Sequence, residues 1–241
     1  MTSNEIKFVK SLQQKKFRDE SGLFVVEGEK LVAEALASPF QVEQVYRAEE
    51  IGEKAMERIS GLSSPSPVLA LVRRPQLPQT PEWPAKGLFL ALDGIRDPGN
   101  LGTILRIADW FGLDGIFASP DTAEVFAPKV VQATMGAIFR VHYRADVNLP
   151  AFCRQVVSAG GTVYGTFLDG RNIYERPLSN GTERPSIIVI GNEARGISPA
   201  VAAEVSDRLY IPPYPAGEPG SESLNAAVAT AVTVAEFRRR A

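Results

Sequence analysis

The sequence predicts an α/β protein in two parts, and three observations support that prediction. Short apolar runs alternate with amphipathic stretches along the chain, which is typical of strands alternating with helices. The stretch 73–86 contains four prolines, which exclude regular helix and sheet and favour an extended spacer. Beyond it the apolar runs become continuous, as in parallel strands covered by helices on both faces. We therefore predict a small α/β domain over 1–74, a Pro-rich linker over 75–86 and a parallel-sheet domain over 87–241.

Length and composition limit the classes of protein to which the chain can belong. It has 241 residues, of which 44% are hydrophobic and 22% charged, as expected for a globular protein of one large or two small domains. No apolar run approaches the roughly 20 residues that span a bilayer, and the polar N-terminus does not resemble a signal peptide. The net charge of −2 argues against strong general affinity for nucleic acid but permits a local basic patch.

The chain has one cysteine and one histidine, which narrows the chemistry further. Cys153 alone excludes an internal disulfide and a cysteine-cluster zinc site, which favours a reducing compartment, the cytoplasm. With His142 as the single histidine, neither a histidine-based metal site nor a catalytic triad is expected. We therefore expect no bound metal.

The first part has the pattern of a compact α/β unit. Its first helix carries lysines and arginines opposite an apolar face, and such a charged face is either simply solvated or contacts the phosphates of a nucleic acid. The predicted elements are a helix over 4–18, a strand and turn over 22–28, a helix over 29–37, a strand over 42–46, a helix over 48–59 and a strand over 68–72.

The second part alternates strands and helices, which predicts a parallel sheet covered on both sides. Its final helix has alanine or valine on nearly every side, so we expect it to be buried or to lie in an interface. The predicted strands are 88–92, 115–118, 162–167, 187–190 and 208–211, and the predicted helices are 100–111, 125–135, 149–159, one that begins at Pro199 with the Ser198 hydroxyl as its cap, and the Ala-rich helix that follows Asn225.

Ligands of open parallel sheets bind beyond the carboxyl ends of the strands, and four turns of this kind stand out. They are 93–100, the end of the strand at Thr166, 191–196 and 213–223. Glycines in such turns let the backbone approach a ligand closely. None of the turns matches the phosphate loop of nucleoside triphosphatases or the GxGxxG dinucleotide motif. Their coincidence, rather than any single turn, indicates a cofactor pocket, and Arg106 on the helix that follows the first turn favours an anionic substrate.

These turns, in this order, resemble the motifs of the SpoU (TrmH-like) branch of the SPOUT RNA methyltransferases. The first motif is NLGTILR at 100–106, the second is IVIGNEARGIS at 188–198, and the third is Ile-Pro at 211–212 followed by SLNAAVA at 223–229. The segment FVVEGEKLV at 24–32 is similar to the L30e-like domain that precedes the catalytic domain in many members.

The resemblance implies a SPOUT domain with a deep trefoil knot, preceded by an L30e-like domain that binds the RNA substrate. It also implies S-adenosylmethionine as the cofactor, methyl transfer to a ribose 2′-OH, a homodimer, and no part for a metal or a membrane. Ribosomal RNA is favoured because the N-terminal domain resembles the extension of rRNA-type members. The loop 212–222 is longer and richer in proline than the usual form, which affects the substrate side of the pocket.

The resemblance also implies roles for individual residues. Arg106 is the base proposed for the family, but a guanidinium is almost always protonated, so we expect it to clamp the neighbouring phosphate and stabilise the developing alkoxide. Glu193 is expected to hold Asn100 or to balance the charge of Arg106. The implied catalytic and supporting residues are Asn100, Arg106, Glu193, Ser223 and Asn225, and the implied cofactor-binding residues are Thr166, Gly191, Asn192, Gly196, Ile211 and Leu224.

Three alternatives stay open on the sequence. The first is a tRNA 2′-O-methyltransferase of the same family. The second is a non-catalytic RNA-binding protein with a degenerate catalytic domain, against which the intact Asn100, Arg106 and Asn225 argue. The third is a nucleotide-dependent metabolic enzyme of an unrelated α/β fold, which binding of ATP or NAD would favour.

Overall fold

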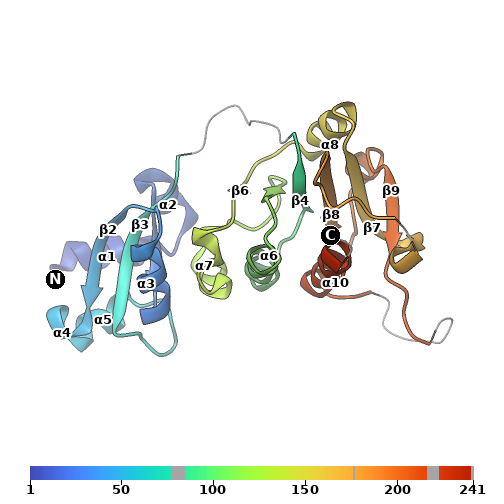
Figure 1. The fold of residues 1–241 in the computed structure, drawn as a ribbon. Coiled ribbons are helices and arrows are strands. Elements are labelled where there is room, and N and C mark those ends of the chain that lie inside the picture. Colours follow the sequence, from blue (N-terminus) through green and yellow to red (C-terminus); the bar gives the residue numbers. More distant parts are fainter. Residues whose placement is uncertain (77–84, 176, 216–222, 240–241) are drawn as a thin grey trace. The chain divides into compact units, whose positions relative to one another are not determined.

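The computed structural model describes residues 1–76, 85–175, 177–215 and 223–239. The chain divides into two compact units (Figure 1). The first combines Met1–Leu77 with Glu124–Arg140, and the second combines Pro78–Ala123 with Val141–Ala241. Most of the predicted linker over 75–86 lies outside the described residues.

The first unit is built on a three-stranded sheet. Its strand order is β1-β3-β2, and both neighbouring pairs are antiparallel. The three strands predicted in this part are confirmed within a residue or two. The elements are β1 (Leu23–Glu27), β2 (Val42–Arg47), β3 (Val68–Arg73), α1 (Ser3–Ser11), α2 (Lys15–Ser21), α3 (Glu29–Ala37), α4 (Ala48–Ile51), α5 (Glu53–Ile59), α7 (Pro128–Thr134) and the 3-10 turn η1 (Ala137–Phe139).

Two helices predicted as continuous are each broken in two. The helix predicted over 4–18 ends at Ser11, with Leu12 as its C-cap, and Gln14 adopts an extended conformation before α2 begins. The break lets the buried Arg18 on α2 donate a hydrogen bond to the carbonyl oxygen of Leu12, at 2.7 Å. The helix predicted over 48–59 breaks at Gly52, whose φ of 86° lies in the left-handed region that favours glycine.

Residues 124–140 pack into the first unit, far in sequence from the rest of it. The Glu124 carboxylate accepts hydrogen bonds from Arg18 Nε at 3.2 Å and from Arg74 Nη2 at 2.8 Å, and it also pairs with Arg18 Nη2. The Phe126 ring lies 4.8 Å from the Phe24 ring, centroid to centroid. The helix predicted over 125–135 is present as α7, but its contacts are made with the first unit.

The second unit is built on a parallel sheet, as predicted, but the sheet has six strands because the short β6 was not among the five predicted. The strand order is β6-β5-β4-β8-β7-β9, and each neighbouring pair is parallel. Its strands are β4 (Gly87–Asp93), β5 (Gly115–Ala118), β6 (Tyr143–Arg144), β7 (Thr162–Asn172), β8 (Pro185–Gly191) and β9 (Asp207–Tyr210).

Helices cover both faces of this sheet (Figure 1). On one face, α8 packs against β7, β8 and α9, and on the other α6 packs against α10. The helical elements are α6 (Pro98–Trp110), α8 (Leu149–Ser158), α9 (Pro199–Ala202), α10 (Ala226–Arg239) and the 3-10 turn η2 (Ile173–Glu175).

The alternation of side chains along β8 assigns residues to the two faces. Ile187 and Val189 share a buried cluster with Phe152 and Cys153 of α8. Because successive strand residues point to opposite faces, the equally buried Ile188 faces α6 and α10. Burial on both faces explains why the sequence of this strand is continuously apolar.

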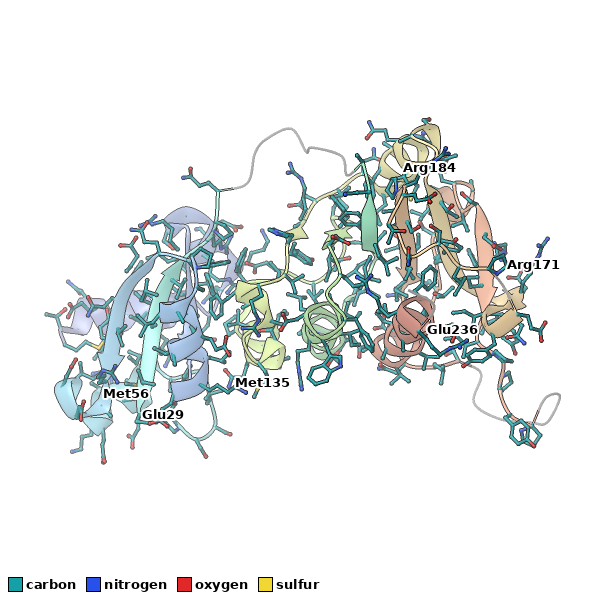
Figure 2. The ribbon with its side chains drawn as sticks, in the orientation of Figure 1. Glu29, Met56, Met135, Arg171, Arg184 and Glu236 are labelled. Carbon is teal, nitrogen blue, oxygen red and sulfur yellow. The ribbon has the colours of Figure 1, made fainter. Side chains whose placement is uncertain are left out.

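One detail of the second unit differs from the sequence prediction, and the burial of the final helix bears on another. The Ser198 hydroxyl does not cap α9, because no helix amide donates to it. Helix α10 is buried along one face only, where polar Thr230 and Glu236 also lie, and Val228 on the other face is 48% exposed. Glu236 pairs with Arg239 at 2.8 Å (Figure 2).

Candidate functional site

The predicted cofactor residues come together because their strands are neighbours. Strands β8, β7 and β9 are adjacent and parallel, so their carboxyl ends meet at one edge of the sheet. Gly191 ends β8, Thr166 lies on β7, and Ile211 directly follows β9. Leu224 stands just before α10 and is 47% exposed. The Thr166 hydroxyl donates to the Val189 carbonyl at 3.3 Å. The edge therefore offers backbone groups, one hydroxyl oxygen that can still accept, and apolar side chains within one region.

Three residues from three separate motifs form one hydrogen-bonded chain. The amide nitrogen Nδ2 of Asn225 donates to Oδ1 of Asn100, at 2.9 Å. Nδ2 of Asn100 then donates to Oε1 of Glu193, at 2.6 Å. The three residues come from the start of α10, the first turn of α6 and the loop after β8. We call this set the Asn225–Asn100–Glu193 chain.

The start of α10 sets the direction of this chain. Oδ1 of Asn225 accepts hydrogen bonds from the backbone amides of Ala227 and Val228, at 2.9 and 3.2 Å. An asparagine amide has one accepting and one donating end, so this cap leaves the Asn225 nitrogen to face Asn100. Asn100 must then accept from Asn225 and donate to Glu193.

The loop after β8 is closed on itself. Asn192 and Gly196 exchange two backbone hydrogen bonds, of 3.0 and 2.8 Å. The Asn192 side chain donates to the carbonyl of Gly94 at 2.8 Å and accepts from the amides of Ala194 and Arg195. The polar groups of Asn192 are thus engaged within the protein, a bracing role that its motif position did not reveal.

Gly191 is the point of closest backbone approach in this loop. A Cβ atom at this position would lie 2.3 Å from the carbonyl carbon of Gly196 and from the nitrogen of Ile197. No side chain fits there, because real Cβ contacts do not reach such distances. A glycine at 191 is therefore required for the loop to close over the strand end.

Strand β7 makes an excursion beside the predicted cofactor residues, which the sequence did not indicate. Its pairing with β9 is interrupted between Thr166 and Arg171, and Leu168 in the excursion is 70% exposed. Pairing resumes where Gly170 passes close to Leu209, since a Cβ at 170 would lie 2.5 Å from the Leu209 carbonyl carbon. Glycine at 170 is the sequence signal that could have located this bulge.

Arg106 and Ser223 are present but stand apart from the Asn225–Asn100–Glu193 chain. Both side chains are exposed. Among the described residues, neither makes a hydrogen bond or an ion pair. The expectation that Glu193 holds Asn100 is met, whereas Glu193 makes no ion pair with Arg106 within the described part of the chain.

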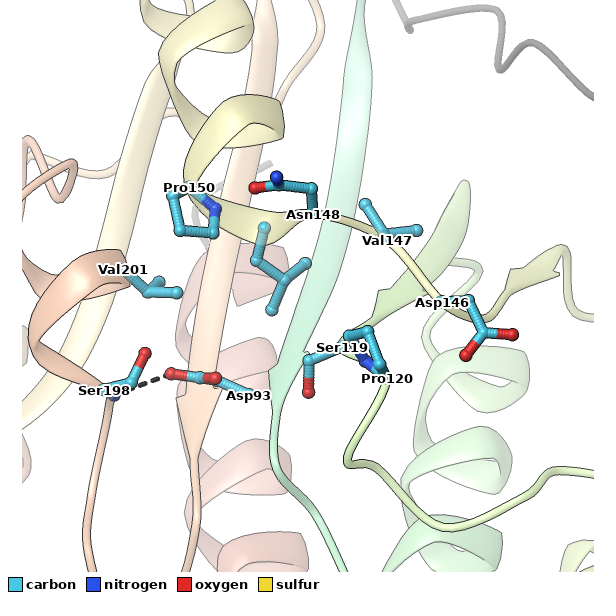
Figure 3. Close-up of a pocket in the computed structure, with 10 residues that line it drawn as sticks. Asp93, Ser119, Pro120, Asp146, Val147, Asn148, Pro150, Ser198 and Val201 are labelled. Atoms are coloured by element: carbon cyan, nitrogen blue, oxygen red, sulfur yellow. Dashed lines mark hydrogen bonds between the residues drawn. The ribbon is translucent and has the colours of Figure 1, made fainter.

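A separate pocket of about 320 Å³ opens at the carboxyl ends of β4 and β5, beside the start of α8 (Figure 3). Asp93, Ser119 and Asn148 are among its ten lining residues. The Ser119 hydroxyl donates to Asp121 at 2.6 Å, and this hydrogen bond lowers the pKa of the Asp121 carboxyl. The sequence pointed to the turn that begins at Asp93 but not to this pocket.

Two further features bear on the kind of site. Within the ranges that the structure describes, no group of three or more histidine, cysteine, aspartate or glutamate side chains is placed to hold a metal ion. None of the helices in the described residues is both long and apolar enough to cross a membrane.

Comparison with known proteins agrees with this architecture. The model of the SpoU rRNA methylase family matches residues 87–235, and that of the MRM3-like substrate binding domain matches residues 3–63. The chain is 31% identical to the 23S rRNA (guanosine(2553)-2′-O)-methyltransferase RlmP of Bacillus subtilis, over 98% of this chain and 96% of that protein.

Solved structures are similar along the whole chain. A TrmH-family protein from Porphyromonas gingivalis aligns with a TM-score of 0.87 and 42% identity, covering 100% of this chain and 99% of the other. An rRNA methyltransferase from Sinorhizobium meliloti, determined with S-adenosylmethionine bound, aligns with a TM-score of 0.86 and 30% identity, covering 100% and 96%.

The parallel sheet, with three sequence motifs joined at its strand ends, defines a methyltransferase of the SPOUT type. The match to the family model runs from the first strand of this sheet, β4, into the final helix, α10. The chain belongs to the SpoU rRNA methylase family.

Proposed function

We propose that this protein transfers the methyl group of S-adenosylmethionine to a ribose 2′-OH of ribosomal RNA. Membership of the SpoU rRNA methylase family supports the class of reaction and the cofactor. For this protein, the proposal depends on the hydrogen-bonded Asn225–Asn100–Glu193 chain, because these contacts join all three motifs at one place. A degenerate, non-catalytic member would not need that arrangement.

The strand-end residues fit the cofactor. S-adenosylmethionine, when bound, supplies a methyl group on a positively charged sulfur, so no metal is needed to activate the leaving group. We assign Ile211 and Leu224 to apolar contacts with the adenine, which the 47% exposure of Leu224 supports. Gly191 at the end of β8 would offer backbone groups, and Thr166 within β7 would offer its backbone and a hydroxyl oxygen that can accept. Asn192 and Gly196 would act by shaping the loop, since they bond to each other.

The reaction also needs a ribose hydroxyl held in line with that methyl group. We assign the Asn225–Asn100–Glu193 chain to this positioning, because its polar groups have one defined direction. Holding reactants in the correct geometry lowers the activation free energy, by about 7–11 kcal/mol in well-oriented systems.

Arg106 and Ser223 are assigned to the RNA side of the site. Both are exposed and make no hydrogen bond among the described residues, so both are free to meet a substrate. A guanidinium donates two parallel hydrogen bonds to a phosphate. Arg106 would hold the phosphate next to the target ribose and stabilise negative charge on the attacking oxygen.

We further propose that the protein works as a homodimer, with the trefoil knot of its family in the second unit. Helices α6 and α10 pack side by side and leave Trp110 85% exposed and Val228 48% exposed. Trp110 lies near the end of α10, because Arg238 donates to the neighbouring Phe111 carbonyl, and Val228 lies near the start of α10. We assign both ends of this helix pair to one interface. A second copy of the chain would cover it.

Ribosomal RNA is the proposed substrate rather than transfer RNA. The match of residues 3–63 to the MRM3-like substrate binding domain supports this choice, as does the name of the Bacillus subtilis relative, which covers nearly the whole chain. We place the reaction in the cytoplasm. The buried Cys153 supports a reducing compartment, and burial raises the pKa of its thiol to about 12.

Two measurements test the proposal. Calorimetric titration should show saturable binding of S-adenosylmethionine and none of ATP or NAD. Unmodified 23S rRNA, 16S rRNA and tRNA transcripts are then incubated separately with protein and radiolabelled cofactor. An rRNA should gain label at a position that resists alkaline hydrolysis, because cleavage there needs a free 2′-OH. Label in tRNA alone would overturn the choice of rRNA, and no binding of the cofactor by folded protein would overturn the methyltransferase assignment.

A further inference from the structure

We propose that the pocket beside the start of α8 binds a guanine base of the RNA, on the face of the sheet opposite the methyl-transfer residues. The inference rests on the proposed function, because it takes the ligand to be part of the RNA substrate. The pocket lies with α8 and α9 (Figure 3), whereas Asn100 and Asn225 lie at the starts of α6 and α10 on the other face.

The pocket occupies a favoured place for ligands in this kind of sheet. The strand order β6-β5-β4-β8-β7-β9 shows that the chain runs outward from β4 to β6 and then returns to the far side of the sheet. Ligands of open parallel sheets bind beyond the strand ends near such a reversal. Asp93 ends β4 and is paired in register with Gly191 of β8, so the pocket and the cofactor region share the loop after β8.

Asp93 presents one carboxylate oxygen to the pocket that has no protein donor. Its side chain is 92% buried, being 8% exposed, and Oδ2 accepts a hydrogen bond from the amide of Ser198 at 2.7 Å (Figure 3). Its other oxygen, Oδ1, has no donor among the residues that the structure describes. Oδ1 is not one of the fully buried polar atoms that lack a partner in the described residues, so it is open to the pocket. A ligand that brings N–H groups would replace the water that hydrates this oxygen.

The other polar groups of the pocket define the charge of the ligand. The Ser198 hydroxyl caps no helix amide. Asn148 uses Oδ1 to cap α8, at 3.1 Å from the Ala151 nitrogen, which leaves its NH₂ group available as a donor. Asp146 adds a second carboxylate, and none of the ten described lining residues is lysine or arginine. This lining repels phosphate and suits a ligand group with several N–H donors and one acceptor.

The size and walls of the pocket favour a flat group. The volume of about 320 Å³ is at the small end of ligand pockets, which run from about 300 to 1,000 Å³. Val147, Leu149, Pro150 and Val201 supply apolar surface beside the polar groups. One nucleobase fits this description better than a whole nucleotide, whose phosphate would have to remain outside.

Guanine matches the arrangement of donors and acceptors. Its Watson–Crick edge carries two adjacent N–H donors, at N1 and N2. Asp93 would accept one with Oδ1 and the other with the remaining lone pair of Oδ2, while the guanine O6 would accept from an amide such as that of Asn148. Adenine places a ring acceptor beside its donor, and the carboxylate would repel that acceptor. An arginine side chain would also satisfy Asp93. RNA is the better choice because proteins read single-stranded RNA through splayed bases and their Watson–Crick edges.

The test is a titration of the full-length protein, saturated with S-adenosylhomocysteine to occupy the cofactor site. Guanosine 5′-monophosphate, adenosine 5′-monophosphate and N-acetylarginine amide are compared by saturation-transfer NMR and by competition. We expect the guanosine probe to bind saturably, about tenfold or more tightly than the adenosine probe. One bidentate hydrogen-bonded contact to a base edge gives discrimination of this size.

The variant Asp93→Asn inverts the hydrogen bonding with little change of shape. Its oxygen can still accept from the Ser198 amide, while its NH₂ group would face the guanine donors. We expect guanosine affinity to fall about tenfold or more and the preference to shift towards adenosine. Asn148→Asp, which keeps the helix cap, and Ser198→Ala serve as second variants should Asp93→Asn fail to fold, and each should weaken guanosine binding.

The outcomes separate this inference from the proposed function. Equal affinity for the two nucleotides, no guanosine binding, or variants that bind like the wild type would each overturn the guanine site, as would tighter binding of N-acetylarginine amide. Titration of the same preparations with S-adenosylmethionine reports on the proposed function independently. Normal cofactor binding without guanosine binding would reject the guanine site alone.

Discussion

Asn100 owes its orientation to residues more than ninety positions away in the chain. It accepts a hydrogen bond from Asn225 and donates one to Glu193. The motifs predicted a functional role for these three residues, but a motif does not show which residues hydrogen-bond to each other. The partners follow from the capping of α10, because that cap decides which end of the Asn225 amide is free to meet Asn100.

The variant Asn225→Asp separates the cap from the donor. Aspartate caps helices as well as asparagine does, so the thermal midpoint should stay within a few degrees of the wild type. The donor to Asn100 is lost, and a negative charge is added close to Glu193. We expect methyl transfer to fall at least tenfold, measured as radiolabel incorporated into rRNA.

Asn225→Ala is the matched control for this change. It removes the cap as well as the donor, so it should also lower stability by about 1 kcal/mol. Normal turnover of Asn225→Asp would show that the direction of the Asn225–Asn100–Glu193 chain has no part in catalysis.

Arg106→Ala should abolish methyl transfer while leaving the affinity for S-adenosylmethionine within a few-fold of the wild type. The reason is that Arg106 is exposed and is assigned to the RNA rather than to the cofactor. Transfer is measured with the rRNA transcripts and cofactor affinity by calorimetry. Arg106→Lys keeps the positive charge but cannot make the bidentate contact of a guanidinium, so its rate of methyl transfer should lie between those of the wild type and the alanine variant. Near-normal turnover of the alanine variant would refute the assignment.

At the scale of single elements, the loop after β8 decides the shape of the proposed cofactor region. Gly191 and Gly196 both belong to the second sequence motif, but their surroundings in the structure differ. At Gly191 an added Cβ would meet backbone at 2.3 Å, whereas at Gly196 it would meet nothing within 4 Å and only the φ of 69° opposes it. The same substitution should therefore have different consequences at the two positions.

Gly191→Ala should weaken S-adenosylmethionine binding at least tenfold. The loop after β8 must move away from the strand end to make room for the alanine side chain. Gly196→Ala should cost about 1–2 kcal/mol of stability from its left-handed backbone, with a smaller loss of affinity. Calorimetric titration of both variants gives the comparison. Equal affinity in the two variants would contradict the close approach at Gly191.

The segment 124–140 is a second element whose importance only its contacts reveal. Glu124 is the shared partner of Arg18 and Arg74, and the Arg18 side chain is 3% exposed. Removing one partner of a buried ion pair leaves an uncompensated charge, which typically costs about 3–5 kcal/mol. The first unit therefore depends on residues from the middle of the chain.

Glu124→Ala should lower the free energy of unfolding by about 3–5 kcal/mol, measured by urea titration. Lys15→Ala is the control. It removes an ion pair with Asp19 whose side chains are 66% and 44% exposed, so it should cost less than about 1 kcal/mol. A loss below 1 kcal/mol for Glu124→Ala would mean that Arg18 finds another partner or water.

At the scale of the whole molecule, the exposed apolar residues of α6 and α10 argue for assembly. Val228→Asp should convert a dimer into a monomer of 26.1 kDa, because it places a charge in the proposed interface. Val228 lies in the first turn of α10, where an acidic side chain is favourable for the helix, so folding should be preserved. Light scattering after size exclusion measures the mass.

Val157→Asp is the control for that change. Val157 is 44% exposed and lies on α8, on the other face of the sheet, so this variant should remain a dimer. A wild-type protein that is monomeric at every concentration would refute the proposed assembly.

The sequence by itself determined the α/β class, the parallel sheet of the second part and the family. Continuous apolar strands such as 187–190 and the motifs that follow them depend on short-range pattern, which one chain displays directly. Most strands and helices were predicted within a few residues for the same reason. The helix breaks at Leu12 and Gly52 were missed, because tertiary contacts and a single backbone angle decide them.

Only the tertiary structure decided which distant residues meet. The partners of Asn100, the closure of Asn192 on Gly196, the packing of 124–140 with the first unit and the pocket at Asp93 all join segments separated along the chain. Such contacts depend on strand order and on the face to which each side chain points. Local periodicity does not predict which strands become neighbours or which residues then face each other, because the packing of the whole sheet sets the strand order.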